Sequence, residues 1–251
     1  MHFNNAPRDK MKKVLVLGAS GATGRLLVKK LLQKGAEVIA IVRNADSLTS
    51  IGGPHQSLQI VEANISEVPE NDLAQYLKEC EAVLSCLGHN LTFKGIFGHP
   101  RRLVTNAVKK VTKTIESLNT NEKVKIILMN TTGNSNRDIP ENPPLSQRMV
   151  VSLLRFLLPP HADNEEATDF LRMHVGQKNS AIEWVAVRPD GLINEDEVSQ
   201  YDINVSPTRN VIFDAGSTSR INVADFMSNL AVNSELWNEW KGKMPVIYNH
   251  A

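Results

Sequence analysis

The sequence contains only two cysteines, Cys80 and Cys86, and five residues separate them. Two thiols at this spacing do not form a disulfide framework, so we expect a protein of a reduced, cytoplasmic setting. Neither cysteine has a histidine at the spacing of a metal ligand set, and we therefore expect no metal site.

The chain also lacks a charge excess and a long apolar run. Its net charge is +1 over 251 residues, which gives no electrostatic reason to expect nucleic acid or an anionic membrane as a partner. The longest apolar run, residues 149–160, is too short to span a membrane and contains Arg155. The first 13 residues have no apolar core and do not resemble a signal peptide. We expect no transmembrane segment, and the oligomeric state stays open.

Apolar segments of two kinds alternate along the chain. Runs such as "VLVL", "VIAIV" and "KIIL" are typical of parallel strands buried on both faces, and stretches with helical spacing lie between them. This order predicts an α/β fold, a doubly wound parallel sheet with helices on both faces. The expected strands are residues 12–18, 37–44, 58–65, 81–88, 124–133, 182–193, 209–213 and 244–249. The expected helices are residues 24–35, 72–78, 101–118 and 222–233, with one more near the end of 134–180.

Three glycines lie between the first expected strand and the first expected helix, in "VLVLGASGATGRLLVKKLL". Their spacing is G-x-x-G-x-x-G, one residue longer than the simplest dinucleotide fingerprint. A helix N-terminus offers unpaired N–H groups and a positive dipole end, which together favour a pyrophosphate. A tight turn without a ligand is the alternative. The candidate cofactor-binding residues of this turn are Gly18, Ser20, Gly21, Ala22, Thr23 and Gly24.

Arg43 follows the second strand, where an NAD-selective site usually has an acidic residue that binds the ribose 2′-hydroxyl. A guanidinium instead pairs with a 2′-phosphate through two hydrogen bonds. The sequence therefore favours NADP(H) over NAD(H). The alternative is that Arg43 is only a solvated residue at the end of a strand.

The motifs "GASGATG", "VRN", "EANI", "LSCLG", "TTG" and "AVRPDGL" occur in this order between residues 12 and 230. In this the chain resembles the atypical short-chain dehydrogenase/reductase superfamily, in particular the NAD(P)H-binding branch that includes flavin reductase/biliverdin reductase B and the NmrA-like regulators. The resemblance implies a single NAD(P)-binding Rossmann domain over residues 1–251. It also implies a small C-terminal substrate lobe, with residues 134–180 and 191–220 on the substrate side.

The resemblance further implies where each part of the cofactor lies. It places the pyrophosphate on the glycine turn, the adenine at the end of the third strand, and the nicotinamide ribose after the fourth. The nicotinamide itself lies after the sixth strand. The residues at these three strand ends are Ala63, Asn64, Ile65, Cys86, Leu87, Gly88, Arg188 and Pro189.

No tyrosine has a lysine four residues later, because the only tyrosines are Tyr76, Tyr201 and Tyr248. The Tyr-x-x-x-Lys pair of other superfamily members, which delivers a proton to a carbonyl oxygen, is therefore missing. This argues against alcohol, ketone and ordinary sugar-epimerase chemistry. Hydride transfer to a flavin, a quinone or a similar conjugated acceptor needs mainly close positioning of the two rings. We therefore expect an NADPH-dependent reductase with such a small-molecule acceptor.

Three side chains are candidates near the chemical step. Thr131 and Thr132 follow the fifth strand, where the superfamily has a hydroxyl beside the nicotinamide and the substrate; the alternative is that they only form a turn. The third is His174, on the helix expected to begin at Asp163 with Glu166 as its capping partner. His174 shares the apolar stripe of this helix, so it is either a proton donor in the crevice or a core histidine. The predicted catalytic residues are Thr132 and His174.

A second class of function fits the same motifs. An NmrA-like regulator binds NADP(H) without catalysis and changes its partner binding with cofactor occupancy, and the missing Tyr-x-x-x-Lys pair agrees with either function. The apolar segment 145–160 also has several interpretations, namely a core helix, a lid, or a surface for a dimer or a membrane.

Overall fold

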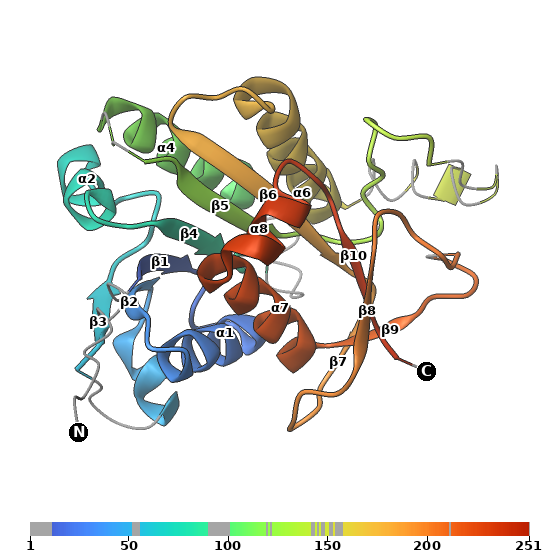
Figure 1. Cartoon of the computed structure of the whole chain (residues 1–251), viewed down its shortest axis with the longest axis horizontal. Helices are drawn as coiled ribbons and strands as arrows, with labels where there is room; N and C mark the ends of the chain where they lie inside the picture. The colour runs from blue at the N-terminus through green and yellow to red at the C-terminus, as the bar shows by residue number, and fades with distance from the viewer. Residues whose placement is uncertain are drawn as a thin grey trace, which may run out of the picture.

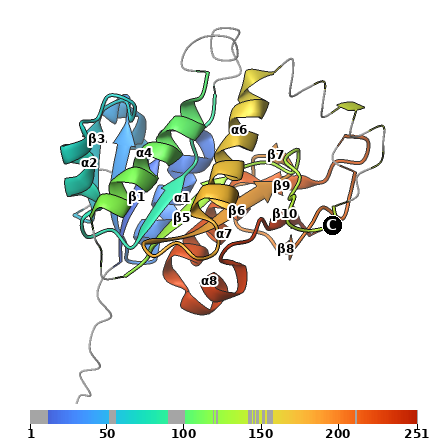
Figure 2. The same ribbon diagram turned by 90° about the horizontal axis from the view of Figure 1, so that it is seen from above.

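The computed structural model describes residues 12–51, 56–89, 101–118, 122–141, 158–210 and 212–250, together with positions 120, 144, 146, 149–150 and 153. Most of segment 145–160 lies outside these residues, so its expected roles stay predictions. An eight-stranded sheet forms the centre of the molecule (Figures 1 and 2), in the order β3-β2-β1-β4-β5-β6-β10-β8. Its strands are β1 (Lys13–Leu17), β2 (Glu37–Val42), β3 (Leu58–Glu62), β4 (Ala82–Ser85), β5 (Val124–Met129), β6 (Ile182–Pro189), β8 (Tyr201–Asn204) and β10 (Val246–Asn249).

The neighbouring strands run parallel except for β8, which pairs antiparallel with β10 at the edge of the sheet. This confirms the expected doubly wound, Rossmann-type α/β fold. The chain enters the sheet at β1, adds β2 and β3 on one side and then crosses to β4 on the other. The order therefore reverses between β1 and β4, and a crevice opens beyond the carboxyl ends of the strands at such a point.

Helices cover both faces of the sheet. α1 (Ala22–Gln33) packs with α7 (Arg220–Val232) and α8 (Ser234–Trp240) over one face. α2 (Glu70–Leu77), α4 (Leu103–Ser117) and α6 (Pro159–Phe170) cover the other (Figure 2). Two apolar cores result, one on each side, which explains why β1 and β5 are apolar at nearly every position.

The segments that follow β6 differ from the expectation in two places. The described residues of 209–213, expected as a strand, form a turn in which the Asn210 side-chain oxygen accepts from the N–H groups of Ile212 and Phe213. Local side-chain bonds of this kind compete with a strand ladder. Two short strands, β7 (Gly191–Ile193) and β9 (Ser217–Ser219), instead form a separate parallel pair.

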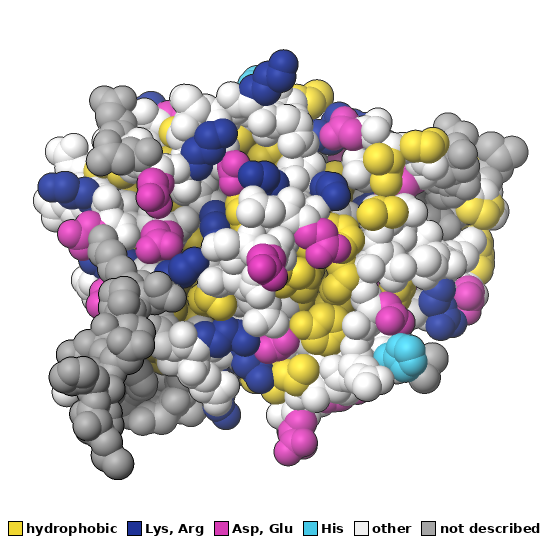
Figure 3. All heavy atoms as spheres, in the orientation of Figure 1, with side chains coloured by type: hydrophobic (Ala, Val, Ile, Leu, Met, Phe, Trp, Pro, Cys, Tyr) yellow, Lys and Arg dark blue, Asp and Glu magenta, His cyan; other side chains and the backbone are white. Residues whose placement is uncertain are grey.

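Charges of both signs are interspersed over the face of the molecule in Figure 3. The helices in the described part of the chain include none that is both long and apolar enough to cross a membrane.

Candidate functional site

A groove of about 280 Å³ lies at the switch point in strand order. The ends of β1, β2, β3 and β4 and the start of α4 line it, as parallel strands that end at one edge require. The lining residues are Leu17, Gly18, Ser20, Gly21, Ile41, Val42, Arg43, Ala63, Asn64, Ile65, Cys86, Leu87, Gly88 and Leu103. The structure thus brings together most of the side chains that the sequence placed around the phosphates, the adenine and the nicotinamide ribose.

The three glycines of the first turn meet different constraints. Gly18 has a φ of +71°, and a Cβ there would lie 2.6 Å from the carbonyl carbon of Cys86. A Cβ on Gly24 would overlap the carbonyl oxygen of Gly18. Gly21 is exposed, and its Cβ would stand 3.3 Å from that same oxygen. The backbone around Gly18 and Gly24 therefore requires glycine at both positions. Gly21 is less constrained by the backbone, and the absence of its side chain leaves space in the groove.

The N-terminus of α1 is open towards the groove. Its N-cap residue is Gly21, no side chain of the described chain caps it, and its first turn contains no acidic residue. The first helical hydrogen bond runs from the Arg25 N–H to the Gly21 carbonyl, so the N–H groups of Ala22, Thr23 and Gly24 precede it. These donors and the positive end of the helix dipole suit a pyrophosphate.

Arg43 stands exposed at the end of β2 and lines the groove. It makes no ion pair with any residue in the described part of the chain. The nearby carboxylate of Glu62 instead accepts a hydrogen bond from the Ala45 N–H at 2.9 Å. The guanidinium is thus positioned to pair with an anionic ligand group.

The ends of β3 and β4 form the far walls of the groove. The Asn64 side chain shapes the first of these turns, because it accepts from the Ser66 N–H at 3.3 Å and donates to Glu67 at 3.2 Å. The Cys86 N–H donates to the Leu17 carbonyl at 2.9 Å, which joins the ends of β4 and β1. Burial raises the pKa of the Cys86 thiol to about 12, so this thiol is protonated at neutral pH and does not act as a nucleophile.

Thr131 and Thr132 follow β5 but face different surroundings. The Thr132 side chain is buried, and its hydroxyl donates to Asp190 at 3.0 Å. Thr132 lines a second cavity of about 390 Å³, between the turn after β5 and residues 206–210, rather than the groove. Thr131 is half-buried, and its hydroxyl oxygen accepts from the Gly133 N–H at 3.3 Å. Its role beside the cofactor stays a prediction.

The Arg188 side chain, expected near the nicotinamide, is completely buried, so only the position of this strand end beside the nicotinamide stays a prediction. Its guanidinium forms a double ion pair with Glu141, at 2.7 and 3.1 Å. The remaining N–H groups donate to the carbonyls of Asn134, Val205 and Met244. Arg188 therefore links the end of β6 to three other chain segments through these hydrogen bonds. Its side chain is not accessible to a ligand. The neighbouring Pro189 is buried in β6 as well.

The expected position of His174 is wrong. The buried stripe of this helix is Ala167, Leu171 and Val175, and Leu171–Val175 is wound as a π-helix that continues α6. This winding puts Val175, not His174, on the buried face. His174 is exposed, stacks on Phe170 with ring centroids 5.0 Å apart, and borders an open surface hollow. It does not line the groove.

Asp163 has a role that no local pattern indicated. The structure starts α6 at Pro159, so Asp163 lies inside the helix that it was expected to cap. Its buried carboxylate instead accepts from the N–H groups of Val104 and Thr105, at 2.8 and 2.9 Å, and so caps α4. The imidazole of His89, directly after the groove residue Gly88, is 2.8 Å from the same carboxylate. The sequence alone could not show that Asp163 caps α4, because almost sixty residues separate the two partners.

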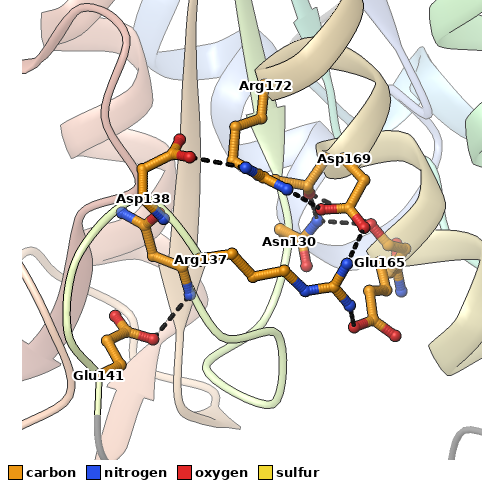
Figure 4. A network of polar contacts seen from close by, with 10 residues as sticks. Asn130, Arg137, Asp138, Glu141, Glu165, Asp169 and Arg172 are labelled. Atoms are coloured by element: carbon orange, nitrogen blue, oxygen red, sulfur yellow. Dashed lines mark hydrogen bonds and ion pairs between the residues drawn. The ribbon is translucent and has the colours of Figure 1, made fainter.

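A network of ion pairs joins the loop after β5 to the outer face of α6 (Figure 4). Arg137 in this loop binds Glu165 and Asp169, at 2.6 and 2.7 Å. In the opposite direction, Arg172 binds Asp138 of the loop at 2.6 Å and Asp169 of its own helix at 3.2 Å. Because one carboxylate joins both arginines, the contacts form a network, which holds geometry better than isolated surface pairs do.

Comparisons with known proteins agree with this geometry. The sequence model of a family described as NAD(P)H-binding matches residues 18–234. An uncharacterised chloroplastic protein of Arabidopsis thaliana is 38% identical over 77 residues, which are 31% of this chain and 27% of that protein. The chain thus matches about a quarter of the length of this curated relative, so nothing about the whole relative transfers.

Three solved structures share the fold over nearly the whole chain. A proposed NAD-dependent epimerase/dehydratase from Bacillus halodurans is 22% identical, with 95% of this chain and 94% of that chain covered and a TM-score of 0.65. A proposed NADH-flavin reductase from Streptococcus pneumoniae is 16% identical, with 95% and 100% covered and a TM-score of 0.62. An anaerobilin reductase from Escherichia coli O157:H7 is 16% identical, with 95% and 97% covered and a TM-score of 0.64.

These structures carry different activities at low identity, so the likeness establishes the fold alone. The family match covers most of the chain and includes the glycine turn and the strand ends that line the groove. The chain belongs to the NAD(P)H-binding family.

Proposed function

We propose that the protein is an NADPH-dependent reductase that passes hydride to a flavin, a quinone or a similar conjugated acceptor. The observation that carries the proposal is the pairing of the open α1 N-terminus with Arg43 in one groove. The first suits a pyrophosphate and the second a 2′-phosphate, so both charged parts of NADPH find a cationic partner.

The residues present fit this cofactor. Gly18 to Gly24 would hold the pyrophosphate, Arg43 the 2′-phosphate, Asn64 and Ile65 the adenine, and Cys86 to Gly88 the nicotinamide ribose. When bound, NADPH supplies a hydride from its nicotinamide ring. The chain's own part is to bind and orient this ring and to exclude groups that would compete for the hydride.

The cavity beside Thr132 is the proposed acceptor site. Its lining falls within or next to the segments expected on the substrate side and consists of residues 206–210 with Thr132, Ser135, Pro140, Glu141 and Pro144. Its volume of about 390 Å³ is within the range of small-molecule pockets. Two reductases with conjugated substrates among the similar structures, one for flavin and one for a bilin, support this class of acceptor.

The test is NADPH oxidation by the purified protein with FMN, riboflavin and quinones supplied in turn. We expect loss of the reduced-nicotinamide absorbance with at least one of them, and faster with NADPH than with NADH. Tight NADPH binding without turnover of any acceptor would contradict the reductase.

That outcome would favour the second candidate, a non-catalytic regulator that senses NADP(H). One observation speaks for it, because Thr132 and His174, the two side chains expected to act in catalysis, both lie outside the groove lining. A regulator should bind NADP⁺ and NADPH with different consequences for a partner protein.

A further inference from the structure

His161 lies where the turn after β5 meets the start of α6. A Cβ added to Gly133 would come within 3.0 Å of the His161 Nε2 and 3.7 Å of the Thr131 hydroxyl oxygen. A side chain at residue 133 would therefore crowd the imidazole. A histidine nitrogen and a threonine hydroxyl therefore border the same small space at the carboxyl edge of the sheet.

The neighbouring residues link this arrangement to the helix beside the groove and to the cavity. Asp163, in the same helical turn as His161, bonds the first N–H groups of α4, and the α4 residue Leu103 lines the groove. On the other side, Thr132 lines the proposed acceptor cavity. The turn of residues 131–133 thus borders the cavity through Thr132, and His161 packs against the same turn.

The other side chains expected near the chemical step have positions that suit proton transfer less well. The Thr132 hydroxyl donates to Asp190, and His174 stands on the outer surface. Cys86 is buried and has no exposed thiolate. Imidazole is the side chain that most often transfers protons near neutral pH, and Thr131 has no acceptor for its own hydroxyl hydrogen within the described residues.

We infer that His161 is the proton donor of the reaction, with the Thr131 hydroxyl orienting the acceptor beside it. This inference rests on the proposed reductase function. The acceptor gains a hydride, with its two electrons, from bound NADPH, which is oxidised to NADP⁺. It gains a proton from His161, and the acceptor is thereby reduced by two electrons and two hydrogens. The imidazole then recovers its proton from water.

The position of His161 can be tested without turnover. In a spectrum that resolves the histidine ring protons, added NADP⁺ should shift the His161 signals and leave those of His250 unchanged. His250 is an exposed imidazole paired with Asp202 and serves as the control. Unshifted His161 signals in a protein saturated with NADP⁺ would overturn the inference.

The chemical role is tested with His161→Gln against His250→Gln, using the best acceptor found. We expect kcat of His161→Gln to fall about a hundredfold or more with NADPH affinity unchanged, and free imidazole to restore part of the rate of His161→Ala. His250→Gln should keep the wild-type rate. Gly133→Ala should lower kcat as well, since its Cβ would displace the imidazole. Thermal unfolding of each variant confirms that it is folded.

Two failures are distinguishable. A wild type that reduces no acceptor defeats the proposed function and the inference together. An active wild type whose His161→Gln variant loses less than about threefold, or whose His174→Gln variant loses more than His161→Gln, overturns the inference alone.

Discussion

Two helices begin beside the same groove, and their first turns are completed in opposite ways. α1 starts at a glycine turn with no capping side chain and no acidic residue. α4 also has no cap of its own, but the buried carboxylate of Asp163 reaches across from α6 and accepts two of its first N–H groups. One positive helix end is therefore open, and the other is neutralised inside the protein.

This difference assigns the two termini different tasks. An anion gains from unpaired N–H groups only where no carboxylate has taken them, so we expect the phosphates at α1. The α4 terminus contributes Leu103 to the groove as an apolar wall instead. Its cap serves stability and position, because the same carboxylate binds His89 beside the groove residue Gly88.

The largest expected effect comes from removing the cap of α4. Asp163→Ala leaves two backbone donors and His89 without their buried partner, and we expect a loss of about 3–5 kcal/mol of unfolding free energy. Urea denaturation measures it. Glu166→Ala, on the same helix with exposed ion pairs to Arg102 and Lys109, is the control and should cost about 1 kcal/mol or less. Equal losses of unfolding free energy in the two variants would contradict the special role of the buried Asp163 carboxylate.

Filling the open turn of α1 should abolish binding while the fold survives. Gly21 has an ordinary extended backbone, with a φ of −71°, and its Cβ would stand 3.3 Å from the Gly18 carbonyl oxygen, so valine needs a small shift of the turn and projects towards the phosphate seat. We expect at least a hundredfold loss of NADPH affinity by calorimetry, since charge-assisted hydrogen bonds contribute about 1.5–3 kcal/mol each and more than one is lost. Gly21→Ala should be intermediate. Unchanged affinity in a folded Gly21→Val protein would move the phosphate seat away from α1.

Arg43 adds a cation to the groove beside the open N-terminus of α1. Arg43→Ala should weaken NADPH binding by about ten- to a hundredfold and leave NADH binding nearly unchanged, since only NADPH has the 2′-phosphate. Titrations of both nucleotides measure the gap. Lys29→Ala removes the same charge from an exposed site on α1 and should preserve the gap. A wild type that binds both nucleotides equally would contradict the preference for NADP(H).

We expect the smallest change in stability when a carboxylate is introduced at the N-terminus of α1, in analogy to Asp163 at the N-terminus of α4. Ala22 is exposed in the first turn of α1, and Ala22→Asp should add about 0.3–1 kcal/mol of stability through the helix dipole. The same carboxylate should repel the phosphates and weaken NADPH binding, less so at high salt. Ala22→Asn is the control, because its side chain has nearly the shape of aspartate without the charge. Tighter NADPH binding by Ala22→Asp would mean that the α1 terminus does not face the anion.

The groove could be predicted from the sequence because each part of it is local. A strand shows itself by an apolar run, and the residue after the run must stand at the carboxyl edge whatever the rest of the chain does. Gly18, Arg43 and Cys86 follow three such runs, Asn64 follows the more polar strand β3, and all four line one groove. The glycine turn likewise depends only on its immediate neighbours.

The other residues depend on choices between distant segments. Asp163 looked like the cap of its own helix, and only the packing of α6 on α4 gives its carboxylate to another helix. Regular α-helical spacing puts His174 on the buried stripe, but the π-helical turn Leu171–Val175 changes this spacing. Arg188 was placed by family resemblance, but its partner Glu141 lies 47 residues away in the sequence. No short pattern contains that pairing.

The unequal demands on the three glycines have a consequence for how such chains diverge. Gly18 and Gly24 are required by the backbone around them, so a descendant that no longer used a dinucleotide would still need both in order to fold. Gly21 would be less constrained, since its backbone is extended and its Cβ would stand 3.3 Å from the Gly18 carbonyl oxygen without overlapping it. The fold thus keeps two glycines of the motif, whereas the middle one depends more than the others on the ligand.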